Sequence, residues 1–278
     1  MISPQQKARF DVFGFIHLRQ QFSAVEMAAA SVEADRLFWE QRGGGPPTGK
    51  NQGIFDIVEK SEVFTNMLVD DRIWATVEAL LGPGFIWNGS GGSLNNEGVN
   101  DKGIHHWHTD RPREPHANTY SFHLYLERLR ADTGALRLIP GSHKPPLYDE
   151  LLPLNEQTGE TARKFLGLSP TEMPGVVIEC DPGDIVFFSQ KIYHGVYGMQ
   201  PGRRFLKLRF AGKLETDEQI ASFMRYNRRG SVYQPEEAFA KSNHPRIRAM
   251  VDPLIELAAR TEAEREHFEA LGASEDRY

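Results

Sequence analysis

The sequence has a single cysteine, Cys180, among its 278 residues, so no disulfide can form within the chain. Chains without disulfides are typical of reducing compartments, and we therefore expect a cytoplasmic location. Cys180 ends the apolar run of GVVIECDPGD. That position indicates a small buried side chain rather than a reactive nucleophile.

Long apolar runs and blocks of like charge are also missing. No stretch reaches the roughly 18 consecutive apolar residues of a membrane helix, and the opening MISPQQKARFDVFGFIHL lacks the apolar segment of a signal peptide. The formal net charge is −6. We therefore expect neither a membrane partner nor a nucleic-acid partner.

What is present is an ordinary globular composition, 40% hydrophobic and 25% charged, with no internal repeat. We expect one domain. Residues 1–84 would form N-terminal helices and a first strand, residues 85–213 a β core, and residues 214–278 a C-terminal helical extension. In the middle part, short apolar runs alternate with Gly and Pro turns, which predicts an antiparallel barrel or sandwich.

The predicted elements before this core are a strand at 14–18 and a helix at 23–40, for which Ser23 is a plausible N-cap. Residues 61–84 carry apolar side chains at helical spacing up to a Gly-Pro-Gly sequence. They predict a helix that ends at this breaker.

Three of the ten histidines stand in the segment IHHWHTD. Side chains alternate between the two faces of a strand, so His108 and Asp110 share one face. An imidazole and a carboxylate in this arrangement can bind one divalent metal, together with a third ligand from another strand. His194, which follows the apolar run IVFF, is the best candidate. Two histidines and one carboxylate leave three positions open on iron, as in Fe(II) oxygenases.

Nine residues after His194 comes the pair Arg203-Arg204. The distal carboxylate of a 2-oxoglutarate cosubstrate needs a fixed partner, and the planar fork of arginine donates two parallel hydrogen bonds to a carboxylate. Even-numbered residues from 204 to 210 form an apolar face, and odd-numbered residues from 203 to 209 a more polar one. We prefer Arg203 as the cosubstrate partner and keep Arg204 as the alternative.

Residues 8–213 contain the motifs FDVFGFIHL, ALLGPG, WHTD, ADTGALRLIPGSHK and GDIVFFSQKIYHG. In these motifs the chain resembles the phytanoyl-CoA dioxygenase family of Fe(II)- and 2-oxoglutarate-dependent oxygenases. The resemblance implies a mainly β fold with flanking helices around a double-stranded β-helix, a jelly-roll or cupin-like core. It implies Fe(II) held by His108, Asp110 and His194, 2-oxoglutarate held by Arg203, and dioxygen as the oxidant.

The implied reaction is hydroxylation of a small organic molecule with release of succinate and CO2. The resemblance also suggests that Asn95 contacts the cosubstrate. Two departures stand out. Family members often carry a serine two residues after the second histidine, where this chain has Val196, and the turn before PGSH is Asp-Thr-Gly. Asp110 argues against halogenation, which needs a small residue at that position.

Four further residues are candidates for the substrate pocket. In YSFHLYL the side chains of His123 and Tyr125 share a polar face, which faces either the barrel mouth or solvent. His106 has the same facing as His108 and lies one pleat away. Arg111 directly follows the ligand pair, and Arg113 comes two residues later. Such cations either attract an acidic group of the substrate or belong to a solvated loop.

Two other functions remain possible on the sequence. A zinc hydrolase of the metallo-β-lactamase type shares the pattern His-x-His-x-Asp, but it normally continues with histidine where this chain has Arg111. A cupin-like barrel that binds metal without catalysis is the second alternative. The sequence selects neither a prime substrate, nor hydroxylation over desaturation or cyclisation, nor an oligomeric state, nor a role for the C-terminal helices.

Overall fold

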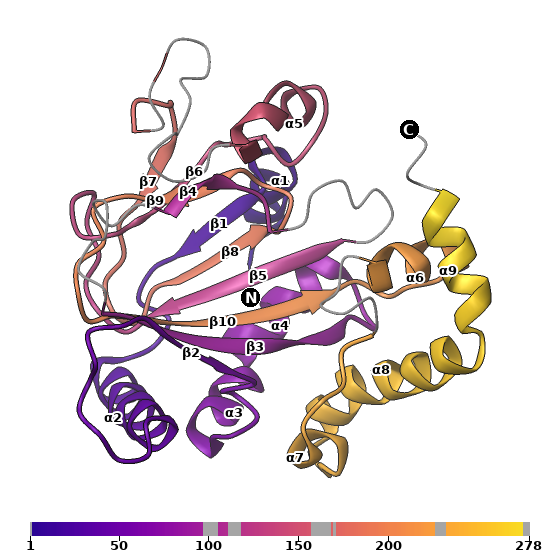
Figure 1. Ribbon diagram of the computed structural model, residues 1–278, viewed down its shortest axis with the longest axis horizontal. Helices are drawn as coiled ribbons and strands as arrows, with labels where there is room; N and C mark the ends of the chain where they lie inside the picture. The colour runs from indigo at the N-terminus through magenta and orange to yellow at the C-terminus, as the bar shows by residue number, and fades with distance from the viewer. Residues whose placement is uncertain are drawn as a thin grey trace.

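The computed structural model describes residues 2–96, 105–110, 118–156, 168, 171–225 and 232–274. Helices flank two antiparallel β-sheets (Figure 1). The strands are β1 (Phe15–Leu18), β2 (Gln52–Phe55), β3 (Ile86–Asn95), β4 (His105–His108), β5 (Thr119–Tyr125), β6 (Leu136–Leu138), β7 (Val176–Ile178), β8 (Ile185–Ser189), β9 (His194–Val196) and β10 (Arg203–Ala211). The helices are α1 (Pro4–Phe13), α2 (Ala24–Gln41), α3 (Glu62–Leu68), α4 (Asp71–Leu81), α5 (Leu147–Glu150), the 3₁₀ helix η2 (Leu152–Glu156), α6 (Asp217–Arg225), α7 (Glu237–Ala240), α8 (Pro245–Ala263) and α9 (Arg265–Ser274).

The two sheets have different sizes. The large sheet has the strand order β1-β8-β5-β10-β3-β2, and the small sheet has the order β4-β9-β6-β7. Strands that follow one another in sequence are therefore often in different sheets, as β4 and β5 are, and the chain crosses between the layers. This arrangement confirms the predicted double-stranded β-helix with flanking helices.

The large sheet has an apolar outer face and a more polar inner face. On β5, Phe122 and Leu124 belong to the main apolar cluster, in which the sheet packs against the N-terminal helices and α8. On β10, Leu206 and Leu208 do the same. The intervening residues of both strands face the interior between the sheets, as strand alternation predicts.

The helix starts follow from their caps. Ser3 before α1 and Ser23 before α2 both form capping boxes with the side chain three residues later. The single helix predicted from the pattern at 61–84 was wrong, because Asp70 caps α4 through the backbone N–H of Arg72 and thereby separates α3 from α4.

Two strands of the large sheet come from the N-terminal region. β1 pairs with β8, and β2 pairs with β3 at the sheet's far edge. The sequence analysis predicted the first of these strands at 14–18 but not the second, and it did not predict that both belong to the same sheet as the core strands. The core itself opens with one long strand, β3, of 10 residues.

The C-terminal helices α6, α8 and α9 form an apolar cluster with the ends of β3 and β10. In Figure 1 they gather at one end of the large sheet, in orange and yellow. Within the described residues, no helix combines the length and the apolar character that a membrane crossing requires.

Candidate metal and cosubstrate site

Two histidines and one aspartate come together on the interior side of the small sheet, at strands β4 and β9. His108, Asp110 and His194 each offer one ligand atom, and these atoms all lie within 4.8 Å of one another. His194 Nε2 is 3.9 Å from Asp110 Oδ1, and the two imidazole rings are 4.2 Å apart between centroids. The three residues that the sequence analysis selected as metal ligands are thus brought together.

The pairing of β4 with β9 creates this convergence. His108 and His194 are directly opposite partners in the antiparallel ladder, so their side chains leave the sheet on the same face. Trp107, the residue before His108, points to the opposite side of the sheet, where it is buried in a cluster with Tyr193 and Tyr197. Asp110 follows two residues after the end of β4.

Hydrogen bonding prepares His194 for a metal. Its Nδ1 lies 2.9 Å from the carbonyl of Ile192, which can only accept a hydrogen bond. Nδ1 therefore carries the hydrogen, and Nε2, on the side of Asp110, is the nitrogen with a lone pair. A backbone carbonyl that fixes the tautomer in this way is typical of metal-binding histidines. The donor set therefore fits a divalent transition metal.

Asp110 is held as a carboxylate by its surroundings. Burial alone would raise its pKa, but the cations and histidines around it, Lys207 first, lower the pKa of Asp110 well below its usual range. Lys207 Nζ donates to Asp110 Oδ2 at 2.6 Å. Ser121 approaches the same oxygen at 3.4 Å and accepts a hydrogen bond from Gln190. Oδ1 is the oxygen on the side of His194.

Arg203 is buried on the inner face of β10, with 5% of its surface exposed. Its Nε donates to the carbonyl of Gly134 at 2.9 Å, and Nη1 donates to Asn95 Oδ1 at 3.1 Å. Its guanidinium carbon lies 5.2 Å from the ring centroid of Tyr125. Among the described residues, no carboxylate forms an ion pair with it, although burial of an unpaired cation is costly.

Arg204 points the other way. It forms ion pairs with Glu127 and Asp35, both at 2.6 Å, and donates to Ser31 on α2. Its hydrogen-bonding capacity is thus used on the outer side of the sheet. Of the two arginines, Arg203 is thus the one on the inner face, and Asn95, predicted to contact the cosubstrate, accepts a hydrogen bond from it.

His123 and Tyr125 lie on the inner face of β5, the first of the two alternatives that the sequence left open, and both are buried. His123 Nδ1 is 3.1 Å from the Tyr125 hydroxyl. The remaining pocket candidates have no described side chain. Arg111 and Arg113 lie outside the described residues, and for His106 only the backbone in β4 is described.

Lys207 is the site residue that the sequence analysis did not assign. Alternation placed it on the polar face of β10, but the same reasoning gave no partner for it. Its contact with Asp110 joins residues 97 positions apart. A lone lysine on a polar strand face carries no signal that identifies such a partner.

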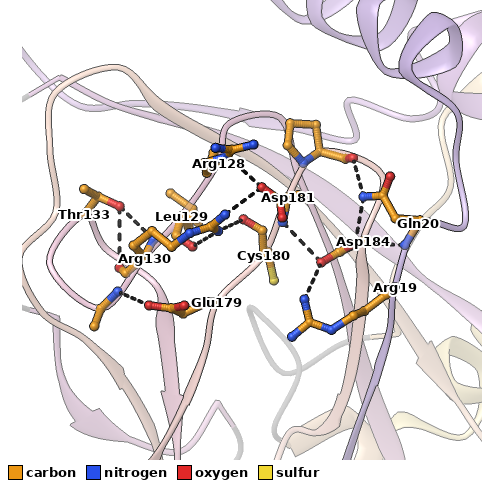
Figure 2. A network of polar contacts seen from close by, with 12 residues as sticks. Arg19, Gln20, Arg128, Leu129, Arg130, Thr133, Glu179, Cys180, Asp181 and Asp184 are labelled. Atoms are coloured by element: carbon orange, nitrogen blue, oxygen red, sulfur yellow. Dashed lines mark hydrogen bonds and ion pairs between the residues drawn. The ribbon is translucent and has the colours of Figure 1, made fainter.

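A second group of potential ligands, His17, Cys180 and Asp184, lies where β1 meets the turn before β8. Its donor atoms are already used within the protein. His17 Nε2 contacts Asp184 Oδ2 at 3.0 Å, and the other Asp184 oxygen accepts from the backbone N–H of Gln20. Figure 2 shows Asp184 within this network, which also ties Arg130 to Asp181. We interpret the group as a structural clamp between β1 and β8.

The sequence is similar to those of known proteins. The family model described as phytanoyl-CoA dioxygenase (PhyH) matches residues 10–198. The ectoine dioxygenase of Sphingopyxis alaskensis is 27% identical over 215 residues, which cover 65% of this chain and 68% of that protein.

Solved structures show the same fold. The structure of HygX from Streptomyces hygroscopicus with nickel and 2-oxoglutarate bound is similar at a TM-score of 0.59 and 19% identity, over 76% of this chain and 87% of that one. Apo EctD from S. alaskensis is similar at a TM-score of 0.58 and 25% identity, over 77% and 79%. Since the family model covers more than half of the sequence, the chain belongs to the phytanoyl-CoA dioxygenase family.

Proposed function

We propose that His108, Asp110 and His194 hold the Fe(II) of this 2-oxoglutarate-dependent dioxygenase, and that Arg203 binds the distal carboxylate of the cosubstrate. The prime substrate is a small organic molecule, which becomes hydroxylated while 2-oxoglutarate is converted to succinate and CO2. The relatives support this substrate class, since ectoine dioxygenase is named for a small molecule.

The observation that carries the proposal is a pair of complementary features on one interior surface. Three metal-binding atoms converge within 4.8 Å, and a buried arginine without a described carboxylate partner lies on the inner face of the opposite sheet. A dicarboxylate that chelates a metal through one end supplies the missing partner for the arginine through the other. The N–H groups of Arg203 that Gly134 and Asn95 do not use are the donors for that carboxylate.

Bound iron supplies the oxidising chemistry, and the protein's own residues position the reactants. Asp110 and the two histidines would hold the metal, and a set of three protein ligands would leave it able to bind the cosubstrate and dioxygen. Lys207 keeps Oδ2 of Asp110 engaged, so that the carboxylate offers the metal one oxygen. Apolar rings line this interior: the ring centroid of Phe188 is 5.1 Å from that of His194, and the ring centroid of Phe205 is 5.0 Å from that of His123.

An anaerobic absorbance titration tests the proposal. Metal-free protein receives Fe(II) and then 2-oxoglutarate, and a weak visible charge-transfer band should develop only when both are present. His194→Ala should not give the band. A folded, iron-loaded wild type without it would contradict the dioxygenase assignment and favour a non-catalytic barrel or, with zinc bound and hydrolase activity, the metallo-β-lactamase alternative.

The adjacent arginines provide a matched pair for the cosubstrate contact. Arg203→Lys keeps the charge but loses the planar fork, so half-maximal band intensity should require about tenfold more 2-oxoglutarate. Arg204→Lys changes the same residue type on the other face and should leave this concentration unchanged. Equal effects of the two substitutions would contradict the role of Arg203.

A further inference from the structure

Two buried side-chain amides of the large sheet lack hydrogen-bond partners. Gln190, which directly follows β8, is 2% exposed, and Asn88, on β3, is 1% exposed. Gln190 Oε1 and both amide atoms of Asn88 have no partner within the described parts of the chain. Burial of a polar atom without a partner is costly, so a protein that keeps two such amides in its interior has a use for them.

A chain of hydrogen bonds fixes the orientation of the Gln190 amide. The carboxylate of Asp110 can only accept, and the hydroxyl of Ser121, 3.4 Å from Asp110 Oδ2, directs its hydrogen there. Ser121 Oγ is therefore an acceptor toward Gln190, whose Nε2 donates to it at 3.0 Å. Gln190 Oε1 consequently remains as an acceptor that requires a donor from outside the chain of contacts.

Gln190 faces the interior between the two sheets. Its backbone N–H donates to the carbonyl of Thr119 and so extends the pairing of β8 with β5. It comes two residues after Phe188, whose ring lies 5.1 Å from that of His194 between centroids. By strand alternation, Gln190 shares this inner face with Phe188, in agreement with its contact to Ser121.

Asn88 reaches the same face through a β-bulge. The register of β3 against β10 shifts between Leu208 and Phe210, so that Asn88 and Gly89 together oppose Arg209. Leu208 and Phe210 belong to the outer apolar cluster, and Arg209 between them therefore faces inward. A Cβ built on Gly89 would lie 3.0 Å from Arg209 Nη2, which places the bulge on the interior side.

The two amides are the ends of an interior row that crosses four strands and consists of Gln190, Ser121, Arg209 and Asn88. Neighbouring strands are about 4.8 Å apart, so the backbones at the two ends are about 14 Å apart. The row passes the metal site at Ser121, beside Asp110. A small molecule that lies along the row therefore also lies beside the metal ligands.

The charges around the interior row determine which donor suits it. Lys207 and Arg209 both face inward from β10, and a divalent metal at Asp110 adds further positive charge. An ammonium group would be repelled there. A hydroxyl group donates to Gln190 Oε1 without charge, and at Asn88 it can both donate and accept. The hydrocarbon part of an acyl chain can do neither and would leave the amides unpaired.

We infer that Gln190 and Asn88 bind the prime substrate through the substrate's own hydroxyl groups, and that this substrate is a polyol rather than an acyl chain. The inference rests on the proposed function and adds the substrate class. Gln190 and Asn88 are then specificity-determining residues, held on the wall of the barrel on which Ser121 approaches Asp110.

Succinate formation by the iron-loaded protein tests the substrate class. The compounds are glycerol, D-glucose and myo-inositol, the O-methyl ethers of all three, which accept but cannot donate, and hexanoyl-CoA. We expect at least one of the polyols to stimulate succinate formation, and neither its ether nor hexanoyl-CoA to do so. Stimulation by an ether as strong as by its polyol, stimulation by hexanoyl-CoA alone, or no stimulation by any compound would overturn the inference.

Gln190→Met tests the residue itself, because it keeps the length of the side chain and removes the amide. It should raise the KM for the stimulating polyol by about 10- to 100-fold, with a smaller change in kcat. The matched control is Gln200→Met, the same change at an exposed position after β9, which should leave this KM unchanged. An unchanged KM in Gln190→Met would show that an internal water, not the substrate, completes the contact.

Thermal unfolding of the metal-free protein separates substrate binding from a structural role without any activity measurement. Asn88→Leu removes two unpaired polar atoms at nearly constant shape and should raise Tm by about 2–4 °C. Ser142→Ala should lower Tm, since the buried Ser142 Oγ accepts from the backbone N–H of Tyr193 at 2.9 Å. A decrease in Asn88→Leu like that in Ser142→Ala would overturn the role of Asn88.

The charge-transfer band of the wild type distinguishes failure of the inference from failure of the proposed function. If iron and 2-oxoglutarate give no band, the proposed function fails. If the band is present and the polyol, KM or Tm result is contrary to expectation, only the inference is overturned.

Discussion

At the scale of single residues, Lys207 determines the electrostatics around Asp110. Its Nζ lies 2.6 Å from Asp110 Oδ2, and the side chains of both residues are largely shielded from water. Removal of one partner from such a pair leaves the other charge without compensation in a medium of low polarity. The free energy of unfolding is therefore sensitive to this lysine.

We predict that Lys207→Met lowers the free energy of unfolding of the metal-free protein by about 1–3 kcal/mol, less than for a fully buried pair because water still reaches this one. Urea denaturation measures the change. Bound Fe(II) should reduce the loss, since the metal replaces the missing cation beside Asp110.

The matched control for this prediction is Lys213→Met, which removes a lysine from an exposed pair with Glu215 just after β10. Exposed pairs of this kind contribute less than about 1 kcal/mol. If Lys207→Met and Lys213→Met cost the same, with and without iron, the contact with Asp110 does not stabilise the carboxylate.

At the scale of elements, the turn between β7 and β8 is fixed by one glycine. Gly183 has a φ of +98°, and a Cβ built there would lie 2.2 Å from the carbonyl oxygen of Phe22. The same turn carries Asp184, which holds the segment after β1 through the N–H of Gln20. The close approach of the two backbones leaves no room for any side chain.

We predict that Gly183→Ala destabilises the protein by more than Gly202→Ala does, as measured by thermal unfolding. Gly202 also has a positive φ, +86°, but open space surrounds it, so its substitution costs only the backbone strain of about 1–2 kcal/mol. The additional loss at Gly183 measures the steric conflict with Phe22. Equal losses would indicate that the Phe22 segment moves aside freely.

The elements also show what the sequence could predict. Alternation on β5 and β10 correctly separated the apolar outer face from the polar inner face, because period-two patterns persist through long strands. The pattern at 61–84 concealed a break, since α3 and α4 both have helical periodicity and only the cap at Asp70 separates them. β2 has only four residues and follows a segment rich in glycine and proline, so its pattern is too short to predict a strand.

The sequence predicts site contacts within one short segment more directly than contacts between segments that are far apart in the chain. The His-x-Asp pair lies within three residues, whereas the ladder partnership of His108 with His194 and the contact of Lys207 with Asp110 depend on how strands from distant parts of the chain align.

At the scale of the whole molecule, the N-terminal segment is joined to the loop after β6. The backbone N–H of Gly141 donates to the carbonyl of Phe13 at the end of α1, and the ring of His143 packs directly over Gly14. Burial, assisted by Lys144, lowers the pKa of His143 to about 4. This contact couples the attachment of the N-terminal segment to pH.

The sign of the pH effect follows from the proton count. Between pH 6.5 and 4 the unfolded chain binds a proton at His143, whereas the folded protein does not, so acidification favours unfolding. The full pKa difference corresponds to a loss of at most about 3 kcal/mol over this interval. We predict that His143→Gln lowers the slope of unfolding free energy against pH there, which urea denaturation at successive pH values measures. NMR titration of the His143 ring gives an independent check, and a ring that titrates near 6.5 in the folded protein, with an unchanged slope in the variant, would show that the N-terminal contact is insensitive to protonation.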